Sequence, residues 1–194
     1  EVSKFIRKLK KSAFSHCGIS AQYLQMISCK VRSPISILFN NLFSAGVCPD
    51  LWKIAHITPV YKRSGPKIYK DSYRPISLLA TLSKVCESII HERLLDHFTE
   101  NEIISNKQAA YLKGDSTLSQ LLYITHNIRK AWGSKSIAQT VFLDISAAFD
   151  KVWHKGLLAK LTQVGVEGQF HKVLESYLSN RKQRVLVEGT PSAE

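Results

Sequence analysis

The chain has 194 residues, of which 44% are hydrophobic, so it is long enough to bury one core as a single domain of ordinary size. This composition excludes a disordered chain and a collagen-like repeat, and no apolar run approaches the ~20 residues of a membrane-spanning helix. With 27 Lys and Arg against 15 Asp and Glu, the net charge of +12 indicates a polyanionic partner and says nothing about the fold.

The expected helices and strands mix along the chain, which indicates an α and β class. Hydrophobic spacing predicts helices at residues 2–11, 20–30, 31–45, 78–98, 118–132, 155–164 and 167–179. The first two breaks fall near Gly18 and at Ser33-Pro34, and Ser77 is the expected N-cap of the helix that begins at Leu78. Apolar and β-branched runs predict strands at residues 54–61, 138–143 and 183–187.

The positive charge is concentrated in the first part of the chain, where residues 1–75 hold 13 Lys or Arg and 3 Asp or Glu. Residues 4–11 predict an amphipathic helix with a solvated basic face. Residues 62–74 differ, because their cations surround Gly65-Pro66 on a turn between two strand-like pieces. Charges that converge on such a turn are suited to clamping phosphate, although a solvated loop is an alternative that charge alone does not decide.

The cysteines give no sign of a disulfide or zinc framework. Cys17, Cys29, Cys48 and Cys86 are irregularly spaced, with no C-x-x-C pair. No signal peptide opens the chain, so we expect free thiols without a disulfide partner and an intracellular location. The chain starts at Glu1 and its only methionine is Met26, which is typical of a piece of a longer protein.

The run Val141-Phe142-Leu143-Asp144 places a carboxylate at the end of an apolar strand. Continuous apolar residues are typical of a strand covered on both faces, where a carboxylate is costly to desolvate unless a cation compensates. Asp144 is therefore a candidate ligand of Mg²⁺, which prefers oxygen ligands. A helix cap or surface turn is the alternative for Asp144 and, more strongly, for Asp150. Phe149 alone would more often be a core residue.

Residues 142–161, FLDISAAFDKVWHKGLLAKL, resemble motif A of the reverse transcriptases of non-LTR retrotransposons of the LINE and jockey type. In that motif a strand delivers D-x-x-x-A-F-D into the polymerase palm. Three further blocks follow the family order: DLWKIAHITPVYK at 50–62, YRPISLL at 73–79 with Lys84, Glu87, Arg93 and Leu94, and QAAY at 108–111 with Gly114, Ser116, Thr117, Gln120 and Leu121. Four ordered blocks make the resemblance specific, where any one alone would be weak.

The resemblance implies Mg²⁺-dependent nucleotidyl transfer, in which two metal ions align a primer 3′-hydroxyl with the α-phosphate of the incoming nucleotide. Asp144 would be the metal ligand of motif A, and the backbone carbonyl of Ile145 an auxiliary ligand. Phe149 would exclude a ribose 2′-hydroxyl by steric clash, which selects deoxynucleotides.

The resemblance also implies roles for the cations of the turn. Lys62 and Arg74 match finger positions that hold the triphosphate, and Arg63, Lys67 and Lys70 would contact nucleic acid. An RNA template, a DNA primer and deoxynucleoside triphosphates would be the partners, with no membrane. The nucleus is the expected location, because the family integrates into chromosomal DNA.

The implied fold is α+β, with right-hand polymerase fingers and an incomplete palm, rich in helices around a small mixed or antiparallel sheet. The expected divisions are an N-terminal helical extension at residues 1–45, a fingers-like region at 46–135 and a partial palm with motif A at 136–194.

The sequence departs from the family pattern at two places. It holds no adjacent Asp-Asp pair, which supplies a second catalytic carboxylate in the family, so we expect this chain alone to have no polymerase activity. At residues 15–20, SHCGIS has Cys17 where the family favours an acid, which is consistent with a decayed copy.

Two other functions stay open. A basic nucleic-acid-binding module, or an inert relic, would keep the cations without catalysis. A metal-dependent phosphohydrolase would use Asp144 and Asp150, and it ranks below both.

Overall fold

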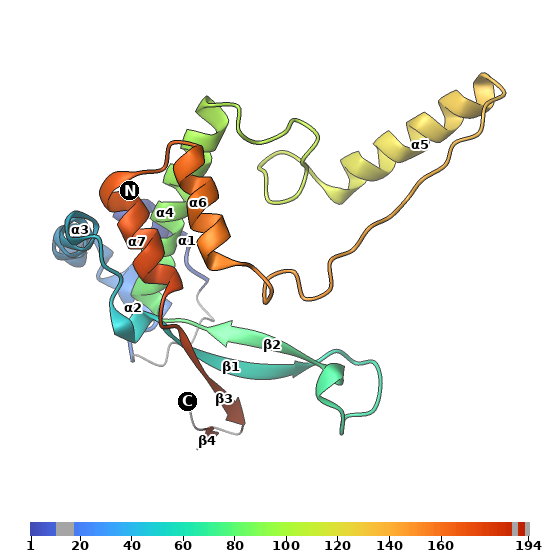
Figure 1. The fold of residues 1–194 in the computed structure, drawn as a ribbon. Helices are drawn as coiled ribbons and strands as arrows, with labels where there is room; N and C mark the ends of the chain where they lie inside the picture. The colour runs from blue at the N-terminus through green and yellow to red at the C-terminus, as the bar shows by residue number, and fades with distance from the viewer. Residues whose placement is uncertain (11–17, 188–189, 193–194) are drawn as a thin grey trace. The chain divides into compact units, whose positions relative to one another are not determined.

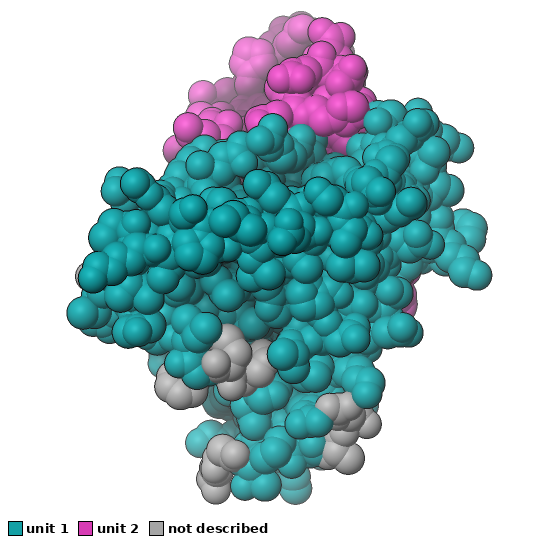
Figure 2. Space-filling view, turned by 90° about the vertical axis from the view of Figure 1, so that its left-hand side faces the viewer, with its two compact units in different colours: residues 1–94, 153–194 teal, residues 95–152 magenta. Residues whose placement is uncertain are grey.

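The computed structural model describes residues 1–10, 18–187 and 190–192, and the chain divides into two compact units (Figures 1 and 2). Unit 1 comprises Glu1–Leu94 and Trp153–Glu194, and unit 2 comprises Leu95–Val152. Unit 1 thus combines two stretches that are distant in sequence. The division into extension, fingers-like region and partial palm follows motif positions instead of contacts, and it stays a prediction.

Helices account for most of the regular structure. The described α-helices are α1 (Val2–Lys8), α2 (Ala21–Met26), α3 (Ser28–Ala45), α4 (Thr81–Glu100), α5 (Thr117–Gly133), α6 (His154–Gln163) and α7 (Gly168–Leu178), with short 3-10 helices η1 (Asp50–Trp52) and η2 (Lys70–Ser72). Within the described residues, none of them combines the length and the apolar character that crossing a membrane requires. The strands are β1 (Ile54–Tyr61), β2 (Tyr73–Leu78), β3 (Lys182–Val187) and β4 (Thr190–Pro191).

The four strands form one mixed sheet in the order β2-β1-β3-β4 (Figure 1). β1 and β2 are antiparallel, with Val60 opposite Arg74, whereas β1 and β3 are parallel. β3 pairs only with Ile54 to Ile57, so Pro59, which has no N–H group, lies where β1 has a neighbour on one side only. A helix-rich chain with a small mixed sheet confirms the α+β class; the fingers and palm assignment stays a prediction.

Several predicted helix boundaries are wrong, including the division between residues 30 and 31, since α2 ends at Met26 and α3 begins at Ser28. Helix α3 runs through Pro34 without a break. Ile35 and Phe39, which follow the proline in the helix, are buried, and their burial stabilises the continuous helix against the cost of an internal proline. Ser77 does not cap α4 but pairs with Ile57 in the β1–β2 ladder. The helix starts at Thr81, whose buried hydroxyl donates to the carbonyl oxygen of Ile19 at 2.5 Å.

The core of unit 1 forms where α3 packs against α1 and α7, and α7 against α6. Ile6 on α1 and Val85 on α4 are completely buried, and Phe39 on α3 is 2% exposed. The ring of Phe39 meets Trp52 edge to face, with centroids 6.1 Å apart. Burial of apolar side chains from helices far apart in sequence therefore joins the two stretches of unit 1.

Unit 2 has no comparable core, since no side chain of residues 95–152, all of them described, is buried. Helix α5 begins where predicted, with the hydroxyl of Ser116 accepting a hydrogen bond from the Ser119 amide at 3.3 Å. Its predicted apolar side is exposed, including Leu118 at 65% and Trp132 at 74%.

Cys29, Cys48 and Cys86 are free thiols. Cys17, with Ser15 and His16 of the SHCGIS segment, lies outside the described residues. Burial raises the pKa of the Cys86 thiol to about 12, so it stays protonated and unreactive at neutral pH.

Candidate nucleotide and metal site

Five cations lie together on one hairpin of unit 1. We call residues 61–74, which contain the end of β1, the start of β2 and the loop between them, the cationic hairpin. Its exposed cations are Lys62, Arg63, Lys67, Lys70 and Arg74, and its only acid is Asp71. The structure therefore confirms the predicted turn between two strands, and it gathers every cation predicted to contact nucleotide or nucleic acid.

Hydrogen bonds inside the loop fix the cationic hairpin. The Lys62 amide donates to the Ser72 carbonyl oxygen at 2.8 Å, and the buried Ser72 hydroxyl donates to the Pro66 carbonyl oxygen at 2.7 Å. Gly65 has a φ of 77°, and a Cβ there would lie 3.0 Å from the Ser72 hydroxyl oxygen. A side chain at this position would therefore be strained and crowded.

Lys62 has a structural contact of its own. Its ammonium group donates to the Asp71 carbonyl oxygen at 2.8 Å. Because an ammonium group has three donors, two remain to meet an anion. Arg74 projects from the edge strand β2, opposite Val60, and is exposed. Of the two residues predicted to hold a triphosphate, Lys62 thus directly follows β1 and Arg74 lies on the adjacent strand β2 of the same hairpin.

The motif A segment in unit 2 differs from its prediction. The expected strand at residues 138–143 does not form; these residues have no regular secondary structure, and Phe142 and Leu143 are 80% and 92% exposed. A strand needs hydrogen-bonding neighbours, and the described sheet pairs none of its strands with this segment. The prediction of a buried strand was wrong because apolar composition does not supply a partner.

Asp144, Ile145 and Phe149 lie in this same exposed segment. The side chain of Asp144 is exposed, as are Ile145 at 73% and Phe149 at 79%. The desolvation argument for a cation at Asp144 therefore does not apply here, and its role depends on the family resemblance. No group of three or more His, Cys, Asp or Glu side chains gathers within the part of the chain that the structure describes.

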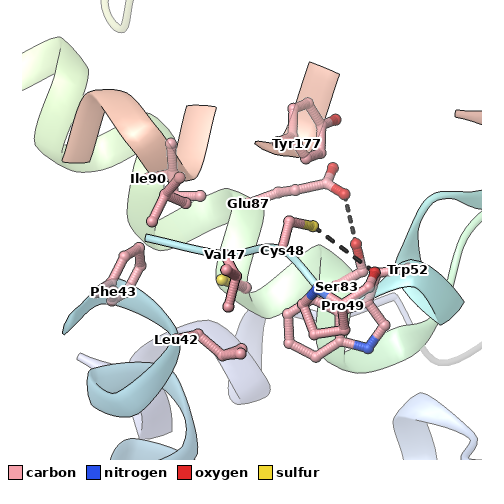
Figure 3. A pocket seen from close by; sticks show the side chains of 12 residues that line it. Leu42, Phe43, Val47, Cys48, Pro49, Trp52, Ser83, Glu87, Ile90 and Tyr177 are labelled. Carbon is pink, nitrogen blue, oxygen red and sulfur yellow. Dashed lines mark hydrogen bonds between the residues drawn. The ribbon is translucent and has the colours of Figure 1, made fainter. Parts of the chain in front are cut away.

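A partly buried carboxylate in unit 1, that of Glu87, was not predicted to have a structural role. Glu87 on α4 lies beside a small cavity of about 10 Å³, enough for one water molecule, whose lining includes Cys48 and Tyr177 (Figure 3). The Ser83 hydroxyl donates to its carboxylate at 2.6 Å. Burial raises the pKa of Glu87, against the effects of the Ser83 hydrogen bond and the positive charges of Arg181 and Lys84.

Glu87, on the helix that follows the hairpin, is affected by the charge of Arg181, which directly precedes β3. The guanidinium of Arg181 lies 4.5 Å from the centre of the Tyr177 ring on α7, and its charge acts on both Glu87 and Tyr177. Glu87 and Arg181 are 94 positions apart in the printed sequence. The sequence of this one chain holds no signal that these two residues lie near each other; covariation in an alignment of relatives is the signal that could have predicted it.

The raised pKa of Glu87 predicts a pH dependence of stability. The native carboxyl binds its proton more tightly than the unfolded chain, so its contribution to the free energy of unfolding falls as pH rises from about 4.3 through the native pKa. Glu87→Gln removes this loss and keeps an acceptor for Ser83. We expect the stability difference, variant minus wild type, to become more positive between about pH 4 and about pH 8 in urea unfolding.

Glu92→Gln is the matched control for Glu87→Gln on the same helix. A hydrogen bond from Lys4 lowers the pKa of the half-exposed Glu92 carboxyl, so its contribution to stability is present at neutral pH and is lost as the pH falls below about 4.3. Its stability difference should therefore change in the opposite direction. Identical pH profiles for Glu87→Gln and wild type would contradict the assignment.

Known proteins resemble this chain along most of its length. A family model described as reverse transcriptase (RNA-dependent DNA polymerase) matches residues 60–192. The probable RNA-directed DNA polymerase from transposon BS of Drosophila melanogaster is 36% identical over 158 residues, covering 81% of this chain and 17% of that protein.

Two further relatives come from the same organism. The probable RNA-directed DNA polymerase from transposon X-element is 32% identical and covers 97% of this chain and 21% of the relative. The RNA-directed DNA polymerase from mobile element jockey is 32% identical and covers 100% of this chain and 21% of the relative. The chain thus spans about a fifth of the length of these relatives.

The four motif blocks, in their order, predicted this result, and the match along residues 60–192 includes the cationic hairpin and motif A. The chain therefore belongs to the reverse transcriptase (RNA-dependent DNA polymerase) family, as a fragment homologous to the RNA-directed DNA polymerases of non-LTR retrotransposons.

Proposed function

We propose that the chain is the fingers and the first part of the palm of an RNA-directed DNA polymerase that extends a DNA primer on an RNA template. The family match over residues 60–192 carries this proposal. In the whole protein, deoxynucleoside triphosphates would be the substrates and Mg²⁺ the cofactor. Residues 46–135 would form the fingers and residues 136–194 the partial palm. The nucleus would be the site of action.

Asp144 and Ile145 would contribute oxygen ligands to the metal site. Mg²⁺ is held in many enzymes through one or two carboxylates together with substrate phosphates, so the Asp144 carboxylate and the Ile145 carbonyl fit one part of such a site. When bound, Mg²⁺ polarises the α-phosphate and stabilises the charge of in-line displacement. Phe149 would lie against the sugar and leave no room for a 2′-hydroxyl.

The cationic hairpin would hold the triphosphate and the nucleic acid. Lys62, at the start of the loop and with two free donors, and Arg74, on β2, present positive charge from a hairpin whose loop is fixed by its own hydrogen bonds. A guanidinium can donate two parallel hydrogen bonds to one phosphate. Arg63, Lys67 and Lys70 would add phosphate contacts along a strand of nucleic acid.

A basic nucleic-acid-binding module is the second candidate function. It is favoured by the exposed cationic hairpin and by the absence of a carboxylate cluster within the described residues. Such a module would use the same five cations and would not need Asp144.

We expect the purified chain to bind RNA and to incorporate no deoxynucleotide. A single motif A carboxylate does not hold two metal ions, whereas phosphate contacts by the cations require no metal. Primer extension on a homopolymer RNA template measures the first property, and binding across a salt series measures the second. Robust Mg²⁺-dependent synthesis would overturn the proposal that the second catalytic carboxylate lies outside this chain. An RNA affinity that does not change with salt concentration would contradict any contact with phosphate.

A further inference from the structure

The cationic hairpin contains three tyrosines, and two of them are used to build it. The rings of Tyr61 and Tyr73 pack together with centroids 5.6 Å apart. The Tyr61 hydroxyl donates to the Gly65 carbonyl oxygen at 2.6 Å, and the Tyr73 hydroxyl donates to the Lys67 carbonyl oxygen at 2.9 Å. The Lys67 ammonium lies 5.7 Å from the centre of the Tyr61 ring. These contacts stabilise both sides of the loop from within.

Tyr69 is different, because its side chain makes no such contact with the described residues and faces solvent. Its side chain is 60% exposed, and the preceding Ile68 is 87% exposed. The Tyr69 backbone is nevertheless fixed, since its amide donates to the Pro66 carbonyl oxygen at 3.3 Å and its carbonyl accepts from the Ser72 amide at 3.0 Å. The loop thus presents one isoleucine and one aromatic ring on an ordered backbone among five cations.

We propose that Tyr69 is a stacking platform for a base of a single-stranded nucleic acid, which in the proposed reaction is the RNA template. A single strand has exposed base faces for the ring and phosphates for the surrounding cations. A duplex hides its base faces, so it offers the loop only phosphates. An ordered loop loses little conformational entropy on binding, which favours this use of an exposed aromatic residue.

Charge complementarity also favours a nucleic acid. The cationic hairpin holds five cations and one acid, and it lies in a chain of net charge +12. An anionic membrane surface would match the charge too, but a single ring and one isoleucine offer a small apolar area to insert, whereas one ring matches one base. The inference depends on the proposed function, because it assumes that this hairpin meets the template.

Binding of the full 194-residue chain to a fluorescent single-stranded oligo(U) RNA tests the role of Tyr69. Tyr69→Ala is expected to weaken binding by about 5-fold to 150-fold, by about the same factor at each salt concentration, because stacking involves no counterion release. Tyr69→Phe, which keeps the ring, should bind like wild type. Tyr23→Ala on α2, where Tyr23 is 56% exposed, is the matched control and should also bind like wild type.

Lys70→Gln gives the contrasting signature. Lys70 is an exposed cation of the same hairpin, and loss of one phosphate contact should make the slope of log affinity against log salt less steep by about 0.7. A smaller effect of Tyr69→Ala on duplex RNA than on oligo(U) is expected, since the duplex has no free base face.

The outcomes separate this inference from the proposed function. If wild type binds oligo(U) with steep salt dependence and Tyr69→Ala binds equally well, the stacking role is overturned and the proposed function is not. If wild type shows no salt-dependent binding, both are overturned. Loss of binding to anionic phospholipid vesicles in Tyr69→Ala, with unchanged RNA binding, would assign the ring to a membrane and overturn the inference.

Discussion

Asp144→Asn is expected to lower primer extension by about 10³-fold when this chain replaces the aligned stretch of the jockey polymerase. The jockey protein aligns with the whole chain, so all 194 residues can replace the aligned stretch. Asparagine keeps the size and one oxygen of the side chain but removes the negative charge that a hard cation such as Mg²⁺ requires. Single-nucleotide incorporation on an RNA template with a DNA primer measures the effect.

Asp96→Asn in the same exchanged polymerase is the control for Asp144→Asn. Asp96 is an exposed aspartate on α4, so its replacement removes the same charge at a position outside motif A. Its incorporation rate should equal that of the unsubstituted exchange. An Asp144→Asn protein that retains the full rate would contradict the assignment of Asp144 as a metal ligand.

Phe39→Ala is expected to lower the free energy of unfolding by about 3–5 kcal/mol, the usual cost of removing a buried phenyl ring. Phe39 is 2% exposed, and its ring meets Trp52 edge to face. It lies on α3, which packs against α1, so the cavity would form in the core of unit 1. Urea unfolding followed by far-ultraviolet circular dichroism measures the loss.

Ile37→Ala is the matched control on the same helix. Ile37 is 58% exposed, so its replacement should change the free energy of unfolding by less than about 0.5 kcal/mol. Equal losses for Phe39→Ala and Ile37→Ala would mean that the packing of α3 against the rest of unit 1 is wrong.

The elements that depend on local sequence could be predicted. The β-branched run gave β1 with the bounds Ile54–Tyr61, and the apolar spacing after Thr117 gave α5 to within one residue of its start. In both cases the residues that decide the structure lie within the element or beside it.

The elements that depend on distant partners could not be predicted. Residues 138–143 have the composition of a buried strand but no neighbouring strand in the described sheet. Pro34 does not break α3, because the burial of Ile35 and Phe39 against other parts of the chain stabilises the helix. Neither the missing partner strand nor this burial can be predicted from the residues of the segment itself.

The candidate site was predictable in part. The order of four motif blocks identified the family. This identification does not depend on the environment of any one side chain. Charge identified the cationic hairpin, but the different roles of its three tyrosines did not follow from composition. The strand register, which places Tyr61 opposite Tyr73 and leaves Tyr69 in the loop, was the missing information.

The most direct measurement of the central claim is deoxynucleotide incorporation by a jockey polymerase that carries the unsubstituted chain in place of its own aligned stretch. The account predicts Mg²⁺-dependent extension of a DNA primer on an RNA template. An exchanged protein that folds and binds the primer–template but extends no primer, beside an active jockey polymerase, would contradict the claim that this chain supplies polymerase fingers and a motif A palm segment.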